Sequence, residues 1–438
     1  MDYPPAVEAL LAKAEARIGD RVRASKAGAV YEGTVMPHHG FSGEDILTLK
    51  LDSGYNVGVA VAGTRLELLA HGAEVAHARH APVADSSLPV VAFLGTGGTI
   101  ASFVDYRTGA VHPAVTAEDL VFSVPELAAV CQPRARKLLS LYSENLKPEH
   151  WSLLAREAAA ELNAGAAGVV IPHGTDTLGY SAAAVSFLLR DLPGPVVFVG
   201  SQRSSDRPSS DAALNLLCAT RTALTDLGEV VAVMHEGTGD EACTIHRGTK
   251  VRKLHTSRRD AFRSVNVPPV GRATASEVVL SGARPRVKGP ARLEGALDAN
   301  VALVHFHPGL TAEDLAHTLQ THKGTVIAGT GLGHVAFDLV PPIRAAITEG
   351  KTVVMTSQCL YGRVDLEVYD SGRDLLAAGA VAGSDMLPET ALAKLMWALG
   401  TYATPAEVRS ALERDVAGEI TARIGLGSAA PQRPHPDI

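Results

Sequence analysis

The chain has 438 residues, of which 46% are hydrophobic and 20% are charged, a composition typical of globular proteins with two or three domains. Its formal net charge of −7 excludes a protein whose entire surface binds nucleic acid, although it permits a local basic patch. The four cysteines are far apart and form no Cys-x-x-Cys motif, which indicates reduced thiols rather than a disulfide framework.

The hydropathy of the chain indicates a cytoplasmic protein. The first segment, MDYPPAVEALLAKAEARIG, has an acid at position 2 and charges throughout, unlike a secretory signal peptide. No apolar run approaches the roughly 20 residues that cross a bilayer. We therefore expect a cytoplasmic location and no contact with a membrane.

The first part of the chain predicts a small β domain. Two prolines near the start and a glycine at the end predict a helix over residues 4–19. Short segments rich in apolar and β-branched residues then predict a barrel-like domain or open sheet that ends near Leu69. These segments are 20–25, 29–37, 45–51 and 55–61. A polar, alanine-rich linker follows, so the first domain with its linker covers residues 1–85.

From Leu88 the pattern changes to buried strands that alternate with helices. Four runs are continuously apolar and predict a parallel sheet covered on both faces: 89–95, 168–174, 195–201 and 229–235. Helical segments at 149–165 and 210–226 lie between them. After a β-rich piece and a basic linker, a second series of strands begins at 301, 325 and 352, and helices near 388–399 and 405–414 close it. The sequence thus predicts a larger α/β domain over 86–284 and a smaller one over 285–438.

Ligands bind beyond the carboxyl ends of strands in such sheets, and the first of these loops is LGTGGTIASF, residues 94–103. A dinucleotide site is disfavoured because Ile100 stands where the third glycine is needed. The glycines would let backbone amides approach a substrate oxygen. The structural alternative is that Thr96 and Thr99 cap the next segment.

A second hydroxyl-bearing loop, HGTDT, spans residues 173–177 and follows the next strand of the series. A threonine hydroxyl is a weak nucleophile and needs a base, or a cation that stabilises developing negative charge. Asp176 adjoins two threonines, and Lys250 and Lys253 occur in a basic segment at 246–264. The histidine pairs near 38 and 80 lack cysteine or carboxylate partners at ligand spacing, so we expect no metal site.

Together, TGGTIAS and HGTDT resemble the two signature motifs of the bacterial-type L-asparaginase/glutaminase family, and the resemblance covers residues 88–438. It implies an asparaginase-like α/β core of two parallel-sheet domains behind the small N-terminal β domain. It also implies a Thr-nucleophile amidohydrolase with four catalytic residues: Thr99, Thr175, Asp176 and Lys253, the last placed before the FRSVN element. Which threonine attacks first stays open.

The same resemblance implies the residues that bind substrate. Ser143 and Glu144 match a Ser-Gln pair that holds the α-amino and α-carboxylate groups, although this chain has Glu in place of Gln. Tyr106 matches a mobile tyrosine that closes the site. Gly98 and Gly174, in the two signature loops, would line the substrate.

The N-terminal β domain and several longer segments, among them KVRKLHTSRRDAF and DMLPETALAKLMW, resemble a narrower family, the D subunits of archaeal glutamyl-tRNA(Gln) amidotransferases. This implies a glutaminase subunit that supplies ammonia from L-glutamine to a partner, the E subunit, for conversion of Glu-tRNA(Gln) to Gln-tRNA(Gln). ATP and Mg²⁺ would bind the partner, and this chain would hold no cofactor. The assembly would be a heterotetramer around a homodimer of this chain, and tRNA would be contacted mainly through the partner.

Other interpretations compete with this one. A free-standing L-asparaginase with an accessory β domain would convert L-asparagine to L-aspartate and ammonia, and a non-enzymatic binding module would have no need of the four catalytic side chains. The basic segment, with seven Lys and Arg residues between 247 and 263, has three interpretations. It could combine the site with partner docking, which we favour, contact RNA phosphates, or be a solvated turn with one catalytic member.

Overall fold

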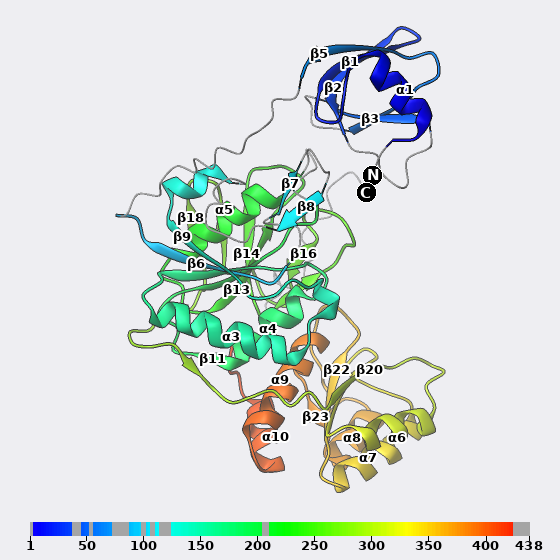
Figure 1. The fold of residues 1–438 in the computed structure, drawn as a ribbon. Coiled ribbons are helices and arrows are strands. Elements are labelled where there is room, and N and C mark those ends of the chain that lie inside the picture. The colour runs from blue at the N-terminus through cyan, green and yellow to red at the C-terminus, as the bar shows by residue number, and fades with distance from the viewer. Residues whose placement is uncertain are drawn as a thin grey trace.

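The computed structural model describes residues 3–36, 45–51, 56–71, 87–97, 102–105, 110–113, 124–203 and 210–423. Its helices and strands form three units in chain order, each built around its own sheet (Figure 1). No helix among the described residues is long and apolar enough to cross a membrane.

The first unit contains one helix and a five-stranded antiparallel sheet in the order β4-β3-β2-β1-β5. Its elements are α1 (Pro5–Lys13), β1 (Arg21–Lys26), β2 (Ala29–Val35), β3 (Ile46–Leu51), β4 (Asn56–Ala60) and β5 (Arg65–Ala70). The four predicted strands are confirmed, and β5 is an additional one that pairs with β1. Val7 of α1 packs on inward-facing Val22, Leu47 and Leu49, which gives the small unit a core of its own.

The predicted helix over 4–19 was too long, because α1 ends at Lys13. The amide of Ala16 donates to the carbonyl of Leu11, and the amide of Glu15 donates to that of Ala12. Glu15 has a φ of 51°, so the turn is a Schellman motif with a non-glycine residue in the left-handed position. The glycine that usually marks such a helix end is absent here. The sequence pattern therefore predicted, wrongly, a helix that continues to Gly19.

The second unit is an eight-stranded sheet in the order β18-β17-β14-β13-β12-β10-β6-β9. Its strands are β6 (Val90–Gly95), β9 (Gln132–Lys137), β10 (Gly168–Pro172), β12 (Val196–Val199), β13 (Val230–His235), β14 (Cys243–Arg247), β17 (Gly271–Ala273) and β18 (Val278–Leu280). The four predicted apolar strands are confirmed, and β9, β6, β10, β12 and β13 are parallel neighbours. The remaining three strands join antiparallel.

Helices cover both faces of this sheet, which explains why its strands are continuously apolar. Alternate side chains of one strand face opposite sides: Val169 packs in the cluster that contains α3 and α4, and Val170 packs in the cluster that contains α5. The helices are α3 (Pro148–Asn163), α4 (Leu178–Leu188) and α5 (Ala212–Ala223). Shorter elements are β7 (Ser102–Asp105), β8 (Ala110–Pro113), β11 (Leu189–Arg190), β15 (Val251–Lys253), β16 (Phe262–Ser264) and β19 (Arg292–Leu293).

The third unit is a four-stranded parallel sheet in the order β20-β21-β22-β23. Its elements are β20 (Val301–His305), α6 (Ala312–Thr321), β21 (Gly324–Gly329), α7 (Val340–Thr348), β22 (Thr352–Ser357), α8 (Asp370–Ala378), β23 (Val381–Ala382), α9 (Pro388–Thr401) and α10 (Pro405–Glu413). The two closing helices occur where the sequence predicted them. Trp397 of α9 stacks on Phe187 of α4 at a centroid distance of 5.9 Å, so the second and third units share one core.

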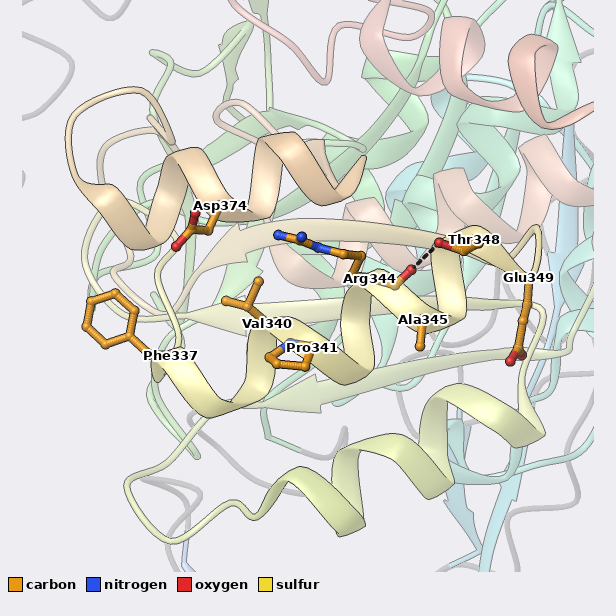
Figure 2. A pocket seen from close by; sticks show the side chains of 8 residues that line it. All are labelled: Phe337, Val340, Pro341, Arg344, Ala345, Thr348, Glu349 and Asp374. Atoms are coloured by element: carbon orange, nitrogen blue, oxygen red, sulfur yellow. Dashed lines mark hydrogen bonds between the residues drawn. The ribbon is translucent and has the colours of Figure 1, made fainter.

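A surface cavity of about 730 Å³ lies on the third unit, beside α7 (Figure 2). Phe337, Val340 and Pro341 form its apolar part, with Arg344 and Asp374 near them. None of these residues belongs to the sites that the sequence predicted.

Candidate active site

Three of the four predicted catalytic side chains meet at the carboxyl end of β10. The Lys253 Nζ donates to the Oγ1 of Thr175 at 2.9 Å and to the Oδ1 of Asp176 at 2.8 Å. The lysine lies at the end of β15, which pairs with β16 as an antiparallel hairpin. The Lys253 side chain is 15% exposed, whereas that of Asp176 is 69% exposed. The cluster is therefore packed on the lysine side and open to solvent on the carboxylate side.

The loop that carries Thr175 is held by buried polar contacts. His173 Nδ1 lies 2.6 Å from the carbonyl oxygen of Gly174, so it must be the donor there, and Nε2 accepts from the Ser181 hydroxyl at 2.9 Å. Burial lowers the pKa of His173 to about 4, so the imidazole is neutral near pH 7. Thr96 is also buried and donates to the carbonyl of Pro172 at 3.0 Å, which ties the first signature loop to the second.

Two glycines allow close approach of neighbouring loops at the site. A Cβ on Gly200, just after β12, would lie 2.7 Å from the Cγ2 of Thr175. A Cβ on Gly174 would lie 2.8 Å from the Cβ of Ser143, and the Thr177 hydroxyl donates to the Ser143 carbonyl at 2.7 Å. Ser143, which was predicted to bind substrate, is therefore packed against the loop that carries Thr175.

The other predicted site residues are only partly placed. Glu144 follows Ser143 in a short 3₁₀ turn and is exposed. Thr99, Gly98 and Tyr106 lie outside the described residues, so their roles stay predictions.

One residue of the site was not singled out from the sequence. Asp211 is fully buried, and its carboxylate accepts hydrogen bonds from the Ser201 hydroxyl, the Gln202 amide and the Asn215 side chain. These bonds hold the start of the loop after β12, directly beside Thr175. The sequence indicates this loop as a strand-end segment. An aspartate directly before a helix is also an ordinary N-cap, so no local signal identifies Asp211 as a residue that supports the site.

Every cation of the basic segment has a partner within the chain. The ion pairs are Arg247 with Glu229, Lys250 with Asp385, Arg252 with Glu389, Lys253 with Asp176, Arg258 and Arg263 with Asp260, and Arg259 with Asp240. Most of these partners come from other elements. The segment therefore acts mainly to build and support the site, and its positive charge is largely neutralised within the protein.

The buried histidines make stability depend on pH. Burial lowers the pKa of His246 to about 3, as it lowers that of His173 to about 4, from an ordinary value of 6.5. The unfolded chain binds these protons more readily, so stability falls as pH drops below 6.5. Between pH 7 and pH 5 we expect each histidine to lower the free energy of unfolding by about 2 kcal/mol.

Urea unfolding at the two pH values measures this change, and the His173→Asn variant serves as the control. In the variant, the decrease in the free energy of unfolding between pH 7 and pH 5 should be smaller by the contribution of His173, while the contribution of His246 remains. An unchanged pH dependence in the variant would show that His173 does not stay neutral in the folded protein.

Chemically, the cluster can activate a hydroxyl for attack on a carbonyl carbon. The Lys253 ammonium is placed where it would stabilise negative charge that develops on the Thr175 oxygen, and Asp176 would provide a counter-charge and a proton acceptor beside it. An arrangement of alcohol, lysine and carboxylate that opens to solvent suits hydrolysis of an amide.

Comparison with known proteins agrees with this fold and chemistry. Residues 90–286 match the model of the asparaginase N-terminal domain, 300–412 match the glutaminase/asparaginase C-terminal domain, and 16–69 match the GatD N-terminal domain. The structure of the thermostable L-asparaginase from Thermococcus kodakarensis superposes with a TM-score of 0.68 at 36% identity and covers 76% of this chain and 100% of that one. The structure of L-asparaginase I from Vibrio cholerae superposes with a TM-score of 0.66 at 28% identity, and it covers the same shares of the two chains.

Relatives that match this chain over nearly its whole length identify a narrower family. The D subunit of glutamyl-tRNA(Gln) amidotransferase from Pyrococcus furiosus is 49% identical over 427 residues, which is 95% of this chain and 97% of the relative. The D subunit from Archaeoglobus fulgidus is 50% identical over 408 residues, 92% and 95% of the two chains. The fold and the Thr–Lys–Asp cluster define an amidohydrolase of the asparaginase class. Within that class, the chain belongs to the family of glutamyl-tRNA(Gln) amidotransferase D subunits, as its sequence motifs predicted.

Proposed function

We propose that this chain is the glutaminase subunit of a glutamyl-tRNA(Gln) amidotransferase, which releases ammonia from L-glutamine for amidation of Glu-tRNA(Gln). The observation that carries the proposal is the contact of Lys253 with both Thr175 and Asp176, in a chain that matches a D subunit over 95% of its length. A binding module without enzymatic activity would not require this cluster.

The proposed reaction uses the side chains of the cluster in sequence. The α-ammonium of glutamine binds near Asp176 and Glu144, both of which are exposed carboxylates. A threonine hydroxyl, from Thr99 or Thr175, adds to the side-chain amide carbon and passes its proton to the neighbouring base. The C–N bond then breaks, the amide nitrogen leaves as ammonia with that proton, and an ester remains. Water hydrolyses the ester, which releases glutamate and restores the hydroxyl.

The partner carries the rest of the proposed reaction. Ammonia passes to the E subunit, where ATP and Mg²⁺ activate the glutamate on the misacylated tRNA, and the complex is a heterotetramer around a homodimer of this chain in the cytoplasm. The tRNA binds mainly through the partner. Neutralisation of the basic segment by internal ion pairs supports this division, because it removes the strongest local candidate for binding phosphate in this chain.

A free-standing L-asparaginase is the second candidate, favoured by the structural likeness to two L-asparaginases over 76% of the chain. Ammonia release from glutamine and from asparagine should be measured for the purified chain alone and with its partner and acylated tRNA. The proposal expects glutamine as the substrate and a rate that rises in the complete complex. Rapid asparagine hydrolysis by the chain alone, with no response to the partner, would overturn it in favour of the asparaginase.

A further inference from the structure

A second lysine of the hairpin segment, Lys250, forms a buried ion pair with the third unit. Its Nζ lies 2.6 Å from the Oδ2 of Asp385, with both side chains fully buried, and it also donates to the Asp385 carbonyl at 3.2 Å. Asp385 lies between β23 and α9, far along the chain. This ion pair is separate from the cluster at Thr175, but its lysine, Lys250, precedes Lys253 by only three residues.

The other end of the hairpin returns to the same aspartate. Asn266, two residues after β16, donates from its side-chain amide to the carbonyl of Asp385 at 3.2 Å and exchanges two hydrogen bonds with Gly362. The amide of Val265 donates to the carbonyl of Lys250 at 2.9 Å and closes the base of the hairpin. Both ends of a hairpin with strands of only three residues are therefore attached to one residue of the third unit.

Asp385 also binds the C-terminal segment. Its Oδ1 accepts from the Thr421 amide at 2.9 Å, and its Oδ2 accepts from the Thr421 hydroxyl. Burial by itself would raise the pKa of the Asp385 carboxyl, but Lys250 and the bonds from Thr421 outweigh burial and leave the pKa below its ordinary value. The carboxylate is thus charged and fully satisfied in the folded protein.

We infer that Asp385 is a positioning residue of the glutaminase site, which acts through Lys250 and Asn266 to hold the Lys253 ammonium against Thr175 and Asp176. The inference rests on the proposed function. The reason is geometric: a short hairpin keeps the lysine at hydrogen-bond distance from two oxygens only if its base cannot shift, and a displacement of about 1 Å at a reacting group costs on the order of 100-fold in rate. Asp385 touches no substrate atom in this scheme.

The same region contains a matched control. Lys394 and Glu419 form another fully buried ion pair, and Glu419 also accepts from backbone amides of the C-terminal segment, Val416 and Ala417. In the described part of the chain, neither residue forms a hydrogen bond or ion pair with the hairpin. Asp385→Asn and Glu419→Gln therefore each leave a buried lysine without its paired carboxylate and loosen the same segment. Only the first removes a carboxylate that binds the base of the hairpin, through Lys250, while the main-chain carbonyl of residue 385 still accepts from Asn266.

The test measures glutamine hydrolysis by the full chain with its partner, normalised to the folded fraction. Asp385→Asn should lower kcat by about 100-fold with little change in KM, because Ser143 and Glu144 lie on a different loop, and Glu419→Gln should keep kcat near the wild-type value. Equal kcat values for the two variants would overturn the inference. Absence of glutamine hydrolysis in the wild-type protein would instead overturn the proposed function.

A second variant keeps the test valid if Asp385→Asn folds poorly. Lys250→Met combined with Asp385→Leu replaces the ion pair with apolar side chains of similar volume, an exchange that proteins commonly tolerate. The apolar pair should keep this part of the core packed, so the double variant should fold. It lacks the directional ion pair between residues 250 and 385 and the bonds from Thr421, so it should keep the lowered kcat. Wild-type kcat in the double variant would contradict a positioning role for Asp385.

Discussion

Lys253→Met should lower the rate of ammonia release from glutamine by about 10³-fold and leave the protein folded. The ammonium contacts both the Thr175 hydroxyl and the Asp176 carboxylate, so its loss removes the positive charge that the proposed mechanism places beside the Thr175 oxygen. Stability should change by less than about 1 kcal/mol, because water can solvate the exposed Asp176 carboxylate once its partner is gone. Steady-state kinetics and urea unfolding measure the two effects separately.

The control for this variant is Arg259→Met, in the same segment and with the same change of charge. Arg259 pairs with Asp240 and donates to the carbonyl of Thr238, and among the described residues no hydrogen bond or ion pair joins it to Thr175, Asp176 or Lys253. Its variant should keep a rate close to that of the wild type. If Lys253→Met retained full turnover, or if the two variants lost activity equally, Lys253 would have no part in the chemistry.

Gly200→Ala should lower kcat by about 100-fold through a steric effect on Thr175. The added Cβ would lie 2.7 Å from the threonine Cγ2 and 3.0 Å from the carbonyl oxygen of His173, so the threonine or the loop after β10 must shift. That loop is fixed by the His173 hydrogen bonds, and the shift therefore falls on the Thr175 side chain and its hydroxyl. Glutamine kinetics together with the folded fraction at the assay temperature measure the effect.

Gly237→Ala provides the comparison, since a Cβ at that position meets no atom of the described residues within 4 Å. It should leave kcat unchanged. A normal rate in Gly200→Ala would mean that the close contact in the structure does not restrict the position of Thr175 during the reaction.

Much of the core could be predicted because its signals are local. The continuously apolar strands indicated a sheet covered on both faces, and the two hydrophobic clusters confirm it, with neighbours such as Val169 and Val170 on opposite sides. The carboxyl end of β10 followed from the same pattern, so Thr175 and Asp176 could be expected at the ligand edge of the sheet. The stop of α1 at Lys13 could not, because Glu15 occupies a position where glycine is the usual signal.

The choice between two lysines shows where sequence reasoning depended on resemblance. Spacing alone left both Lys250 and Lys253 as candidates, and only the likeness to a family motif selected Lys253. Lys253 is the last residue of β15 and reaches Thr175 and Asp176, whereas Lys250 lies in the turn before that strand and is buried against Asp385.

Local order in the chain was therefore sufficient to define the apolar core strands, most of the helices, the two hydroxyl-bearing loops and the class of chemistry, but not β5 or the short strands that pair at the edges. Each of these depends on the alternation of side chains or on a short motif, which neighbours in the sequence specify. Contacts between distant segments decided which lysine serves the site, which acids neutralise the basic segment and how the hairpin is anchored. Partners such as Asp385 and Glu389 lie more than a hundred positions from the residues they bind, and only folding brings their charges together.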